Sequence, residues 1–595
     1  MLVRREAGGT IVDLVPEDFN VRTRVHEYGG GAWLQAGEAL FAVNFEDQRL
    51  YRLDPDGPVA ISPEPDVDSG LRYADGRADP EGKLLICVRE SHLGDAVVNE
   101  LVAIPAGGDG EIRVVRNGAD FYAAPRISPD GRRLAWLEWH HPQLPWDGTE
   151  IWVADLAVDG AISAERRVAG GAAESIWQPA WSPTGDLHFV SDCSGWWNLH
   201  RETGEELEAL TAEEAEFGYP HWTFGGSTYA FSGSDIVCVR VADAIERLCL
   251  LQPGGTPEPL DLPFTAFGWN PSLEVCDGRA LFTAGSGDLP AAVIELDLRS
   301  GEWQALHDTE EDTVEAGFVS TPRSIEFPTE GGVDAHAFFY PPANPDFTGP
   351  DGELPPLIVD IHGGPSAHVT NAVSLERLFW TSRGFAVVDV NYGGSTGFGR
   401  AYRERLNGSW GIVDSADCEA AATFLAVNGE VDGEHLAIHG GSAGGYTTLC
   451  ALVFGDRFSA GASYYGVADA ETLAQDTHKF ESRYLDGLIG PYPEAAETYR
   501  ERSPIHFVER LCSPVIVLQG LEDEVVPPAQ AEQIVAAMAA NGIAHAYLAF
   551  EGEQHGFRRA ETIVRALEAE LSFYGQVFGF DPAGEIEPVE IVGAH

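Results

Sequence analysis

Residues 436–446 read LAIHGGSAGGY, a short apolar strand that runs into a turn of glycine and alanine around one serine. Gly440, Ser442 and Gly444 form the pattern Gly-x-Ser-x-Gly, and the next residues, TTLCALVF, have the composition of a buried helix. Chance copies of this pattern are common in a chain with 67 glycines. The strand before it and the helix after it nevertheless favour a nucleophile elbow over a plain glycine-rich turn, because only small neighbours permit so tight a strand-to-helix turn.

Around this turn, apolar strands alternate with helical segments. The strand candidates are LIVDIH (357–362), FAVVDVN (385–391), SAGASYYG (459–466), VIVLQG (515–520) and HAYLAFEG (545–552). The helix candidates are residues 417–427, 529–542 and 561–578. Near-continuous apolar strands separated by helices are typical of a mostly parallel sheet covered on both faces. We therefore predict an α/β-hydrolase domain over residues 321–582, followed by a C-terminal tail at 583–595.

A serine hydroxyl needs a base to take its proton, and this fold supplies the partners in the order Ser, Asp or Glu, His. Asp523 follows the strand VIVLQG, and His555 follows the last strand in AYLAFEGEQHGF. We expect His555 to take the proton of Ser442 while Asp523 holds the other ring N–H.

Three neighbouring groups are alternatives to these partners. Glu522 precedes Asp523 by one residue, but the shape Gly-x-x-Asp-x-x-x-Pro at residues 520–527 favours Asp523. His439 and His545 are weaker candidates for the base, because each lies inside or before a predicted strand.

The oxyanion that develops on the substrate requires two N–H donors. We predict that Ala443, the residue after the nucleophile, supplies one of them. The other is expected from the loop IHGGPSA (361–367), where we choose the N–H of Gly364 and keep Gly363 as the alternative. Glycine lets the backbone approach a substrate closely, whereas Pro365 has no amide hydrogen.

Residues 1–320 consist of short alternating strands broken by Gly, Pro, Asp and Asn, with little helical periodicity. A Pro-x-Gly turn before an apolar strand recurs with its proline at positions 80, 129 and 183, and weaker copies bring the count to six units. A period of about 40–55 residues with about four strands per unit is typical of β-propeller blades, which must stack to cover their apolar faces. We predict an N-terminal all-β propeller over 1–320, with a pair of β-sandwiches as the alternative. The abrupt start at LVRREAGGTIVDL (2–14) leaves an N-terminally incomplete propeller open.

The charge balance is extreme, with 94 acidic against 37 basic residues and a net charge of −57. Only Lys83 and Lys479 are lysines. So acidic a chain repels nucleic acid and anionic membranes, which argues against both as partners. Because acid is spread along the chain and lysine is scarce, as in proteins of salt-loving organisms, we predict a halophilic protein that is most stable in molar salt.

The eight cysteines are scattered without a Cys-x-x-Cys pair or a ligand-like cluster, which favours free thiols in a reducing compartment. The N-terminus lacks the apolar stretch of a signal peptide, and no run reaches the ~18 apolar residues of a membrane span. We expect a cytoplasmic protein with no cofactor and no metal. The sequence leaves open whether the chain forms a homo-oligomer.

These residues resemble the prolyl oligopeptidase family of serine peptidases, in particular its acylaminoacyl-peptidase and dipeptidyl-peptidase-like members. The matching segments are IHGGP (361–365), NYGGSTGFGRAY (391–402), GGSAGGY (440–446), SYYGVAD (463–469), SPIHFVERLCSPVIVLQGLEDEVVP (503–527) and EGEQHGF (551–557). The resemblance implies a propeller that caps the active site and admits short peptides as substrates. It also implies an acyl-enzyme mechanism and an exopeptidase that releases N-acylated residues or dipeptides.

Two departures limit what can be transferred from the family. Relatives often carry an arginine or asparagine two residues after the catalytic aspartate, where this chain has Val525. Relatives that remove dipeptides hold the substrate amine with a propeller glutamate pair, and the pair Glu205-Glu206 is read more simply as a surface turn beside Gly204.

Tyr464, Tyr465 and the segment 469–490 are the candidate walls of the substrate pocket. Two other functions remain alternatives at this point. The chain could be a carboxylesterase that uses the same triad, or a non-enzymatic propeller that binds partners with the second half as a scaffold. The triad residues in the expected order argue against the last.

Overall fold

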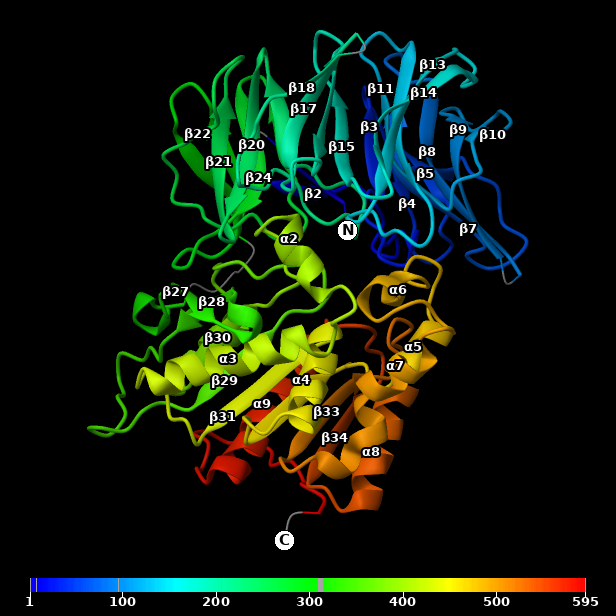
Figure 1. Cartoon of the computed structure of the whole chain (residues 1–595). Coiled ribbons are helices and arrows are strands. Elements are labelled where there is room, and N and C mark those ends of the chain that lie inside the picture. The colour runs from blue at the N-terminus through cyan, green and yellow to red at the C-terminus, as the bar shows by residue number, and fades with distance from the viewer. Residues whose placement is uncertain (1, 7, 95, 205, 309–313, 594–595) are drawn as a thin grey trace.

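The computed structural model of the chain describes residues 2–6, 8–94, 96–204, 206–308 and 314–593. Figure 1 shows an all-β body stacked on an α/β body, with the first half of the chain in the former and the second half in the latter. The architecture changes between β26, which ends at Asp308, and β27, which begins at Arg323.

The all-β body is a propeller of six four-stranded antiparallel sheets, as the sequence repeat predicted. Each blade is a meander of consecutive strands, and the first strands of successive blades lie beside one another, for example β3 beside β7 and β7 beside β11. The strands are β3 (Trp33–Ala36), β4 (Ala39–Val43), β5 (Leu50–Asp54), β6 (Gly57–Ala60), β7 (Leu71–Ala78), β8 (Leu84–Leu93), β9 (Ala96–Pro105), β10 (Arg113–Arg116), β11 (Phe121–Ile127), β12 (Arg133–Trp139), β13 (Thr149–Leu156), β14 (Ile162–Gly171), β15 (Ile176–Trp181), β16 (Leu187–Ser191), β17 (Asn198–Thr203), β18 (Glu206–Ala209), β19 (Tyr229–Ser232), β20 (Asp235–Ala242), β21 (Ile245–Leu251), β22 (Glu258–Pro259), β23 (Glu274–Cys276), β24 (Arg279–Ala284), β25 (Ala292–Asp297) and β26 (Trp303–Asp308).

Side chains at bulges in the first strands link neighbouring blades. The registers of β7, β11 and β15 each shift in mid-strand, and Asp75, Ala124 and Gln178 adopt positive φ there. Such bulges re-aim a side chain locally. The Asp75 carboxylate accepts a 2.7 Å hydrogen bond from the Ala124 N–H of the next blade. The Gln178 amide oxygen likewise accepts from the Thr228 N–H at 2.7 Å.

The abrupt N-terminal segment forms a small ribbon of its own. β1 (Val3–Arg5) pairs only with β2 (Ile11–Asp13), and the chain then packs Val15 and Phe19 against Ala42 of the first blade. All six blades therefore have four strands without a contribution from this ribbon.

The α/β body contains an eight-stranded sheet in the order β27-β28-β30-β29-β31-β32-β33-β34. The six strands from β30 to β34 in that order are parallel, and β27 and β28 are antiparallel at one edge. The strands are β27 (Arg323–Pro328), β28 (Asp334–Tyr340), β29 (Leu357–Ile361), β30 (Ala386–Asn391), β31 (Leu436–Gly441), β32 (Ala460–Tyr464), β33 (Val515–Gly520) and β34 (His545–Phe550).

Helices cover both faces of this sheet, as predicted. Val359 and Ile438 point to the face covered by α3, α4 and α8, whereas Ile358 and Ala437 point to the face covered by α1 and α9. This alternation explains why each strand is apolar throughout. The helices are α1 (Leu375–Thr381), α2 (Arg400–Arg403), α3 (Val413–Val427), α4 (Ala443–Phe454), α5 (Ala470–Gln475), α6 (Tyr484–Leu488), α7 (Ala496–Arg502), α8 (Ala529–Asn541) and α9 (Ala560–Phe578), with 3-10 turns η1 (Ala316–Phe318), η2 (Glu330–Gly332), η3 (Glu404–Leu406) and η4 (Pro504–Arg510).

The last described residues lie along the edge of the sheet. Val592 exchanges two backbone hydrogen bonds with His545 of β34, and Val589 is buried. This segment is therefore packed against the α/β body rather than extended away from it.

Charged and polar contacts join the two bodies through α2 and the loop before it. Arg400 and Arg403 both bond one carboxylate oxygen of Asp192, at 2.8 and 2.9 Å. The Gly399 N–H donates to Glu216 at 3.1 Å. In Figure 1, α2 and α6 are the helices that reach up to the propeller.

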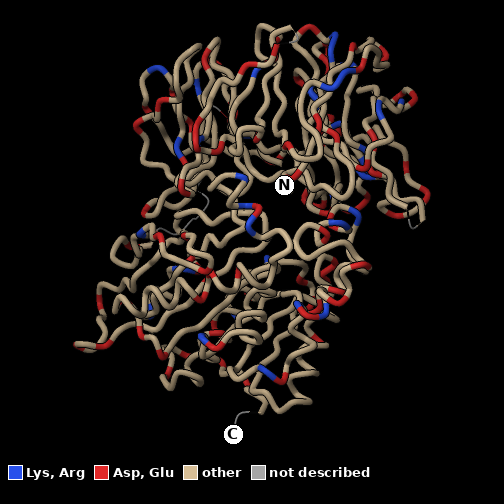
Figure 2. Tube along the Cα trace, viewed as in Figure 1, with Lys and Arg blue, Asp and Glu red and all other residues tan. Residues whose placement is uncertain are grey.

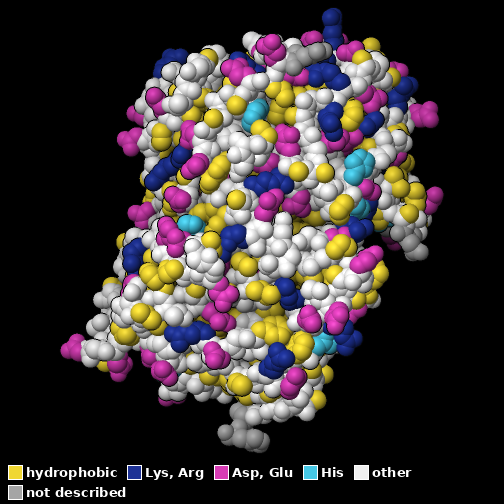
Figure 3. Space-filling view, in the orientation of Figure 1, with side chains coloured by type: hydrophobic (Ala, Val, Ile, Leu, Met, Phe, Trp, Pro, Cys, Tyr) yellow, Lys and Arg dark blue, Asp and Glu magenta, His cyan; other side chains and the backbone are white. Residues whose placement is uncertain are grey.

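Acidic residues are distributed over both bodies. Figure 2 shows them along the chain in both bodies, and Figure 3 shows them over the whole visible face with basic side chains among them. Among the described residues, no helix combines the length and apolar character needed to cross a bilayer.

Candidate active site

Ser442 lies on a strained turn between β31 and α4. Its φ of 57° and ψ of −119° are rare for a residue with a side chain, and such strain is typical of nucleophile elbows. The turn requires glycine on its inner side, because a Cβ on Gly444 would stand 2.2 Å from the carbonyl oxygen of Ile361. The Ser442 N–H is fixed by the carbonyl of Tyr464 at 3.0 Å.

The structure brings Ser442, His555 and Asp523 into one hydrogen-bonded line. His555 Nε2 is 2.9 Å from Ser442 Oγ, and His555 Nδ1 is 2.8 Å from Asp523 Oδ2. The histidine comes from the turn after β34 and the aspartate from the turn after β33, so both stand at the carboxyl end of the sheet beside the elbow. This is the geometry in which an imidazole can take the serine proton and keep its other N–H on a carboxylate.

Asp523 is held by backbone on its second oxygen. Its Oδ1 accepts from the N–H groups of Val525 and Val526, both at 2.9 Å, while Gln519 donates to Oδ2 at 3.3 Å. The residue is 4% exposed, whereas Glu522 is exposed to solvent. Val525, where relatives often carry a polar residue, thus orients the acid through its backbone.

The two alternative histidines are engaged elsewhere. His439 lies in β31, 2.8 Å from Glu570 and 3.5 Å from Asp360. Burial alone would lower the pKa of His439, but these two carboxylates outweigh it and raise the pKa to about 10. His545 bonds the carbonyl of Ile543 at 2.7 Å.

The loop predicted to supply an oxyanion donor runs past the nucleophile. A Cβ on Gly363 would lie 3.5 Å from the Ser442 Cβ, and Gly364 and Ala443 line the same cavity as Ser442. His362 anchors this loop, because its ring stacks on Tyr392 at 4.3 Å between centroids.

His362 also bonds the carbonyl of Gly363 and the hydroxyl of Ser395, both at 2.8 Å. Burial lowers the pKa of His362 to about 4, so the ring is neutral at physiological pH. The propeller contributes to the same loop, since Trp222 donates its indole N–H to the carbonyl of Ser366 at 2.8 Å.

The cavity beside Ser442 is walled largely by apolar side chains. They are Trp410, Val467, Leu473, Leu485, Leu488 and Val526. Thr477, Glu481 and Tyr484 add polar groups to the same wall, and all three belong to the segment 469–490 that the sequence singled out.

Tyr464 and Tyr465, which the sequence suggested as pocket walls, do not line this cavity. They line a separate cavity with Asp360 and Glu376, where the Tyr464 hydroxyl donates to Glu570. Tyr465 instead packs edge-on against the ring of His555, with centroids 5.0 Å apart. The placement of these two residues in the pocket is therefore corrected, because the end of β32 directs them toward α9 and the back of the histidine.

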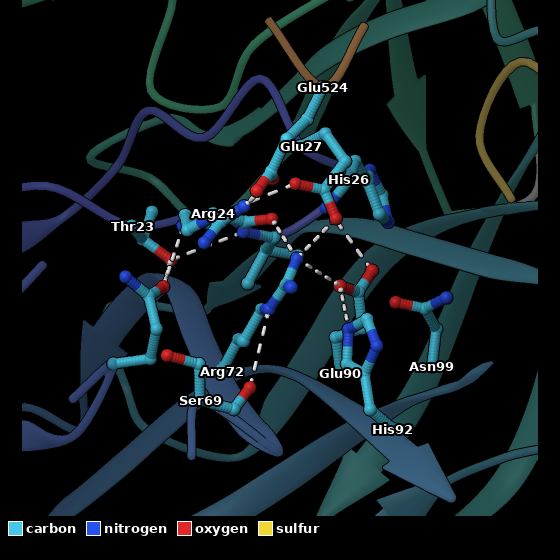
Figure 4. Close-up of polar contacts among 12 residues, drawn as sticks. Thr23, Arg24, His26, Glu27, Ser69, Arg72, Glu90, His92, Asn99 and Glu524 are labelled. Atoms are coloured by element: carbon cyan, nitrogen blue, oxygen red, sulfur yellow. Dashed lines mark hydrogen bonds and ion pairs between the residues drawn. The ribbon is translucent and has the colours of Figure 1, made fainter. Parts of the chain in front are cut away.

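A propeller loop at residues 23–31 reaches the triad, and sequence reasoning did not identify it. Arg24 forms an ion pair with Glu524, which directly follows Asp523. Figure 4 shows Arg72 beneath this loop, where it bonds the Arg24 carbonyl at 2.9 Å and the Glu27 carboxylate. The loop contains the run HEYGGG at 26–31, which the sequence analysis did not single out.

The backbone of this loop is strained, and hydrogen bonds to neighbouring propeller residues hold it in place. His26 and Glu27 have φ of 57° and 67°, and the His26 N–H donates to Glu90 at 3.1 Å. Glu27, Glu90 and His92 bring potential ligand atoms within 4.8 Å of one another, but Arg72 already pairs with both carboxylates. Of the pair Glu205-Glu206, Glu206 begins β18 and is exposed, whereas Glu205 falls outside the described residues.

Comparisons with known proteins agree with the serine-hydrolase geometry of this site. The model of the "Prolyl oligopeptidase family" matches residues 371–581. A solved puromycin-hydrolyzing peptidase of Mycobacterium tuberculosis is 43% identical, with a TM-score of 0.95 over 98% of this chain and 92% of that chain.

Two curated relatives match over a shorter stretch. Dipeptidyl aminopeptidase BIII of Pseudoxanthomonas mexicana is 29% identical over 48% of this chain and 40% of its own length. Dipeptidyl peptidase family member 6 of Caenorhabditis elegans is 32% identical over 39% of this chain and 32% of its own length. The chain thus matches less than half the length of each of these two.

Proposed function

Because the chain belongs to the prolyl oligopeptidase family of serine peptidases, we propose that it hydrolyses short peptides through an acyl-enzyme on Ser442. The observation that carries this proposal is the line of two hydrogen bonds, 2.9 Å from Ser442 to His555 and 2.8 Å from His555 to Asp523. The proposed catalytic residues are these three.

In the first half of the reaction, Ser442 Oγ attacks the scissile carbonyl carbon while His555 Nε2 takes the hydroxyl proton. The N–H groups of Ala443 and Gly364 are the proposed donors to the resulting oxyanion. His555 then returns the proton to the leaving amine, and the acyl group remains on Ser442. Asp523 stabilises the imidazolium throughout.

In the second half, water replaces the amine. His555 takes a proton from the water as it attacks the acyl carbon. When the tetrahedral intermediate collapses, the bond to Ser442 Oγ breaks, His555 returns that proton to Oγ, and the acid product leaves. The same steps hydrolyse esters, so a carboxylesterase remains the alternative function.

Short peptides are the proposed substrates, because the propeller loop 23–31 contacts Glu524, next to Asp523, and Glu481 in the wall of the cavity that contains Ser442. We infer that a site capped in this way excludes folded proteins. Acylaminoacyl and dipeptidyl exopeptidase activities are both consistent with this cap.

The test is hydrolysis of a panel of peptide, aminoacyl and ester substrates by the purified chain, with Ser442→Ala as the control. Puromycin belongs in the panel, because a similar solved structure is titled a puromycin-hydrolyzing peptidase. Turnover of amides that disappears in Ser442→Ala is expected. Ester turnover without any amide turnover would replace the peptidase by an esterase, and failure of a fluorophosphonate to label Ser442 would remove enzymatic function altogether.

We also propose a cytoplasmic, salt-adapted protein. The cysteines within the described residues are all free thiols, and the net charge of −57 is spread over both bodies. The domains we propose are a propeller over 1–320, a catalytic domain over 321–582 and a tail at 583–595. Nucleic acid is not a proposed partner.

A further inference from the structure

Cys238 and Cys249 are direct partners on two antiparallel strands of the fifth propeller blade. β20 and β21 pair in a register that places these two free thiols opposite each other. Both side chains are 0% exposed and belong to one core cluster, whereas the next pair, Val239 and Leu248, packs into a different cluster on the other face. Within the strand pairings of the described residues, no other two cysteines lie opposite each other.

The backbone at this pair has the separation that a disulfide requires. The Val239 N–H donates to the Thr228 carbonyl at 2.7 Å, on the side of β20 away from β21. Because the hydrogen-bonding direction alternates along a strand, Cys238 and Cys249 form a hydrogen-bonded pair, in which Cα atoms are about 5.5 Å apart. Disulfides most often join Cα atoms about 5.5–6 Å apart. No change of strand register is therefore needed to join the two sulfurs.

The closed blade protects both thiols. Burial, together with the neighbouring Cys249, keeps the pKa of Cys238 well above its usual value, and burial raises the pKa of Cys249 to about 12. The thiolate is the form that attacks a disulfide or an alkylating reagent. The pair is therefore inert while the blade is closed and becomes reactive when the blade opens locally.

A cavity brings solvent close to this pair. The cavity has a volume of about 490 Å³, lies between the fourth and fifth blades, and is lined by Arg201 and Glu208, whose side chains are 35% and 57% exposed. Ile236 and Leu251 also line it. They are themselves cross-strand partners on the same face as the two cysteines, two residues along each strand, which is roughly 7 Å. A small molecule in the cavity is thus one residue pair away from the thiols.

The outer edge of the fifth blade is weakly held. β22 consists of two exposed residues, Glu258 and Pro259, whereas β14, the outer strand of the third blade, has ten residues. Pro259 lies opposite Cys249 and has no N–H to donate. Regions with few backbone hydrogen bonds open locally at a low free energy. Opening of this edge exposes Cys249 first.

We propose that Cys238 and Cys249 are a redox modification site that a small-molecule disulfide converts into a reversible protein disulfide. The Cys249 thiolate attacks the small disulfide, which gives a mixed disulfide and releases one small thiol. The Cys238 thiolate then attacks the Cys249 sulfur and releases the second small thiol. Two protein thiols are oxidised, one small disulfide is reduced, and the two cysteine protons end on the released thiols. This inference is independent of the proposed peptidase function.

The hairpin of β20 and β21 carries this pair to the catalytic body. Ala244, at its turn, is 0% exposed and packs in one core cluster with Phe398. Glu246 lies 3.3 Å from Nε2 of His368, which directly follows the loop 361–367 that is proposed to supply an oxyanion donor. A disulfide between the two strands therefore stiffens the hairpin that makes both contacts.

The test treats the folded chain with glutathione disulfide, blocks the remaining thiols with iodoacetamide and maps the disulfides by mass spectrometry. Cleavage at Arg240 and Arg247 places Cys238 and Cys249 on different peptides, and cleavage at Asp261 separates the second peptide from Cys276. The main protein disulfide should link the Cys238 and Cys249 peptides, with a mass about 2 Da below their sum, and dithiothreitol should release them.

The matched control is Cys87→Ala, which removes another buried cysteine of a propeller strand, opposite Val102, and should keep the link. Cys238→Ala should lose it. The oxidised wild-type chain should have a higher Tm than the reduced chain, and the same treatment should not raise the Tm of Cys238→Ala.

Three outcomes overturn the proposal. The first is full alkylation of Cys238 and Cys249 after oxidation, and the second is a main product that joins any other two cysteines. The third is a link between Cys238 and Cys249 that lowers the Tm, because such a link forms in unfolded chains and distorts the blade. The map of the wild-type chain decides the case even where a variant does not fold.

Discussion

Replacing Phe480 by alanine should detach the segment 476–486 from the propeller. Phe480 is 2% exposed, and its ring lies 5.3 Å from His26, 6.1 Å from Trp222 and 6.2 Å from Trp146. Deleting a buried phenylalanine costs about 3–5 kcal/mol when the site cannot collapse. We expect the upper part of that range here, because the surrounding rings belong to several blades and cannot close together.

Native-state amide exchange measures this loss, since it reports the free energy of local opening. In Phe480→Ala, protection in residues 476–490 and 23–31 should fall by about 3–5 kcal/mol, while protection in β31 and β33 should stay as in the wild type. Phe347→Ala removes a ring that is 79% exposed and should change neither region. Unchanged protection of 476–490 in Phe480→Ala would refute the idea that this ring holds the two bodies together.

Other outcomes follow from the same structure. Asp523→Asn should lower kcat by roughly 10⁴-fold with little change in fold, because the imidazole then loses its correct tautomer; a drop below tenfold, measured on the best amide, would contradict the assignment. Gly444→Ala should abolish fluorophosphonate labelling, since the new Cβ would stand 2.2 Å from a carbonyl oxygen; normal labelling would show that the elbow tolerates it. Burial raises the pKa of Glu216 to about 7 in the folded chain, so ionisation of this group lowers the free energy of unfolding as pH rises from about 4.5 to 7. In denaturant titrations, the free energy of unfolding of Glu216→Gln should therefore rise by about 3 kcal/mol relative to that of the wild type between pH 5 and 8. A difference that does not change with pH would refute this. Thermal unfolding in 0.1 and 3 M KCl should give a higher Tm at high salt, because counter-ions screen the net charge of −57; a flat or falling Tm would count against salt adaptation.

Local pattern was enough to predict most of the fold. The run VIVLQG at 515–520 forms β33 over the same residues. A short, fully apolar stretch between two helices is typical of a strand in a sheet that is covered on both faces. The six-unit count of the first half was confirmed for the same reason, since each unit closes its own meander through local turns. The positions of Asp523 and His555 at strand ends followed from the sheet.

The pocket could not be predicted in the same way. Tyr464 ends β32 and Tyr465 has a φ of 39°, so a change of backbone direction decides where both rings point, and alternation along the strand does not reveal it. The contact between Tyr28 and Glu481 joins residues 453 positions apart in two different bodies. No local pattern encodes such a pairing, because it depends on how the propeller docks.

The links between blades bear on how the chain is made. During synthesis, the Asp75 carboxylate has no hydrogen-bond donor until Ala124, 49 residues later, has been added and folded into place. The Gln178 amide oxygen likewise lacks its donor until Thr228, 50 residues later, is in place. At roughly 5–20 residues per second, a ribosome needs on the order of several seconds to supply each missing donor. During that interval the carboxylate and the amide must remain hydrated. We therefore expect each blade to stay loose on the ribosome until its successor has emerged, so that nascent chains stalled one blade apart should gain protease resistance in the preceding blade at each step.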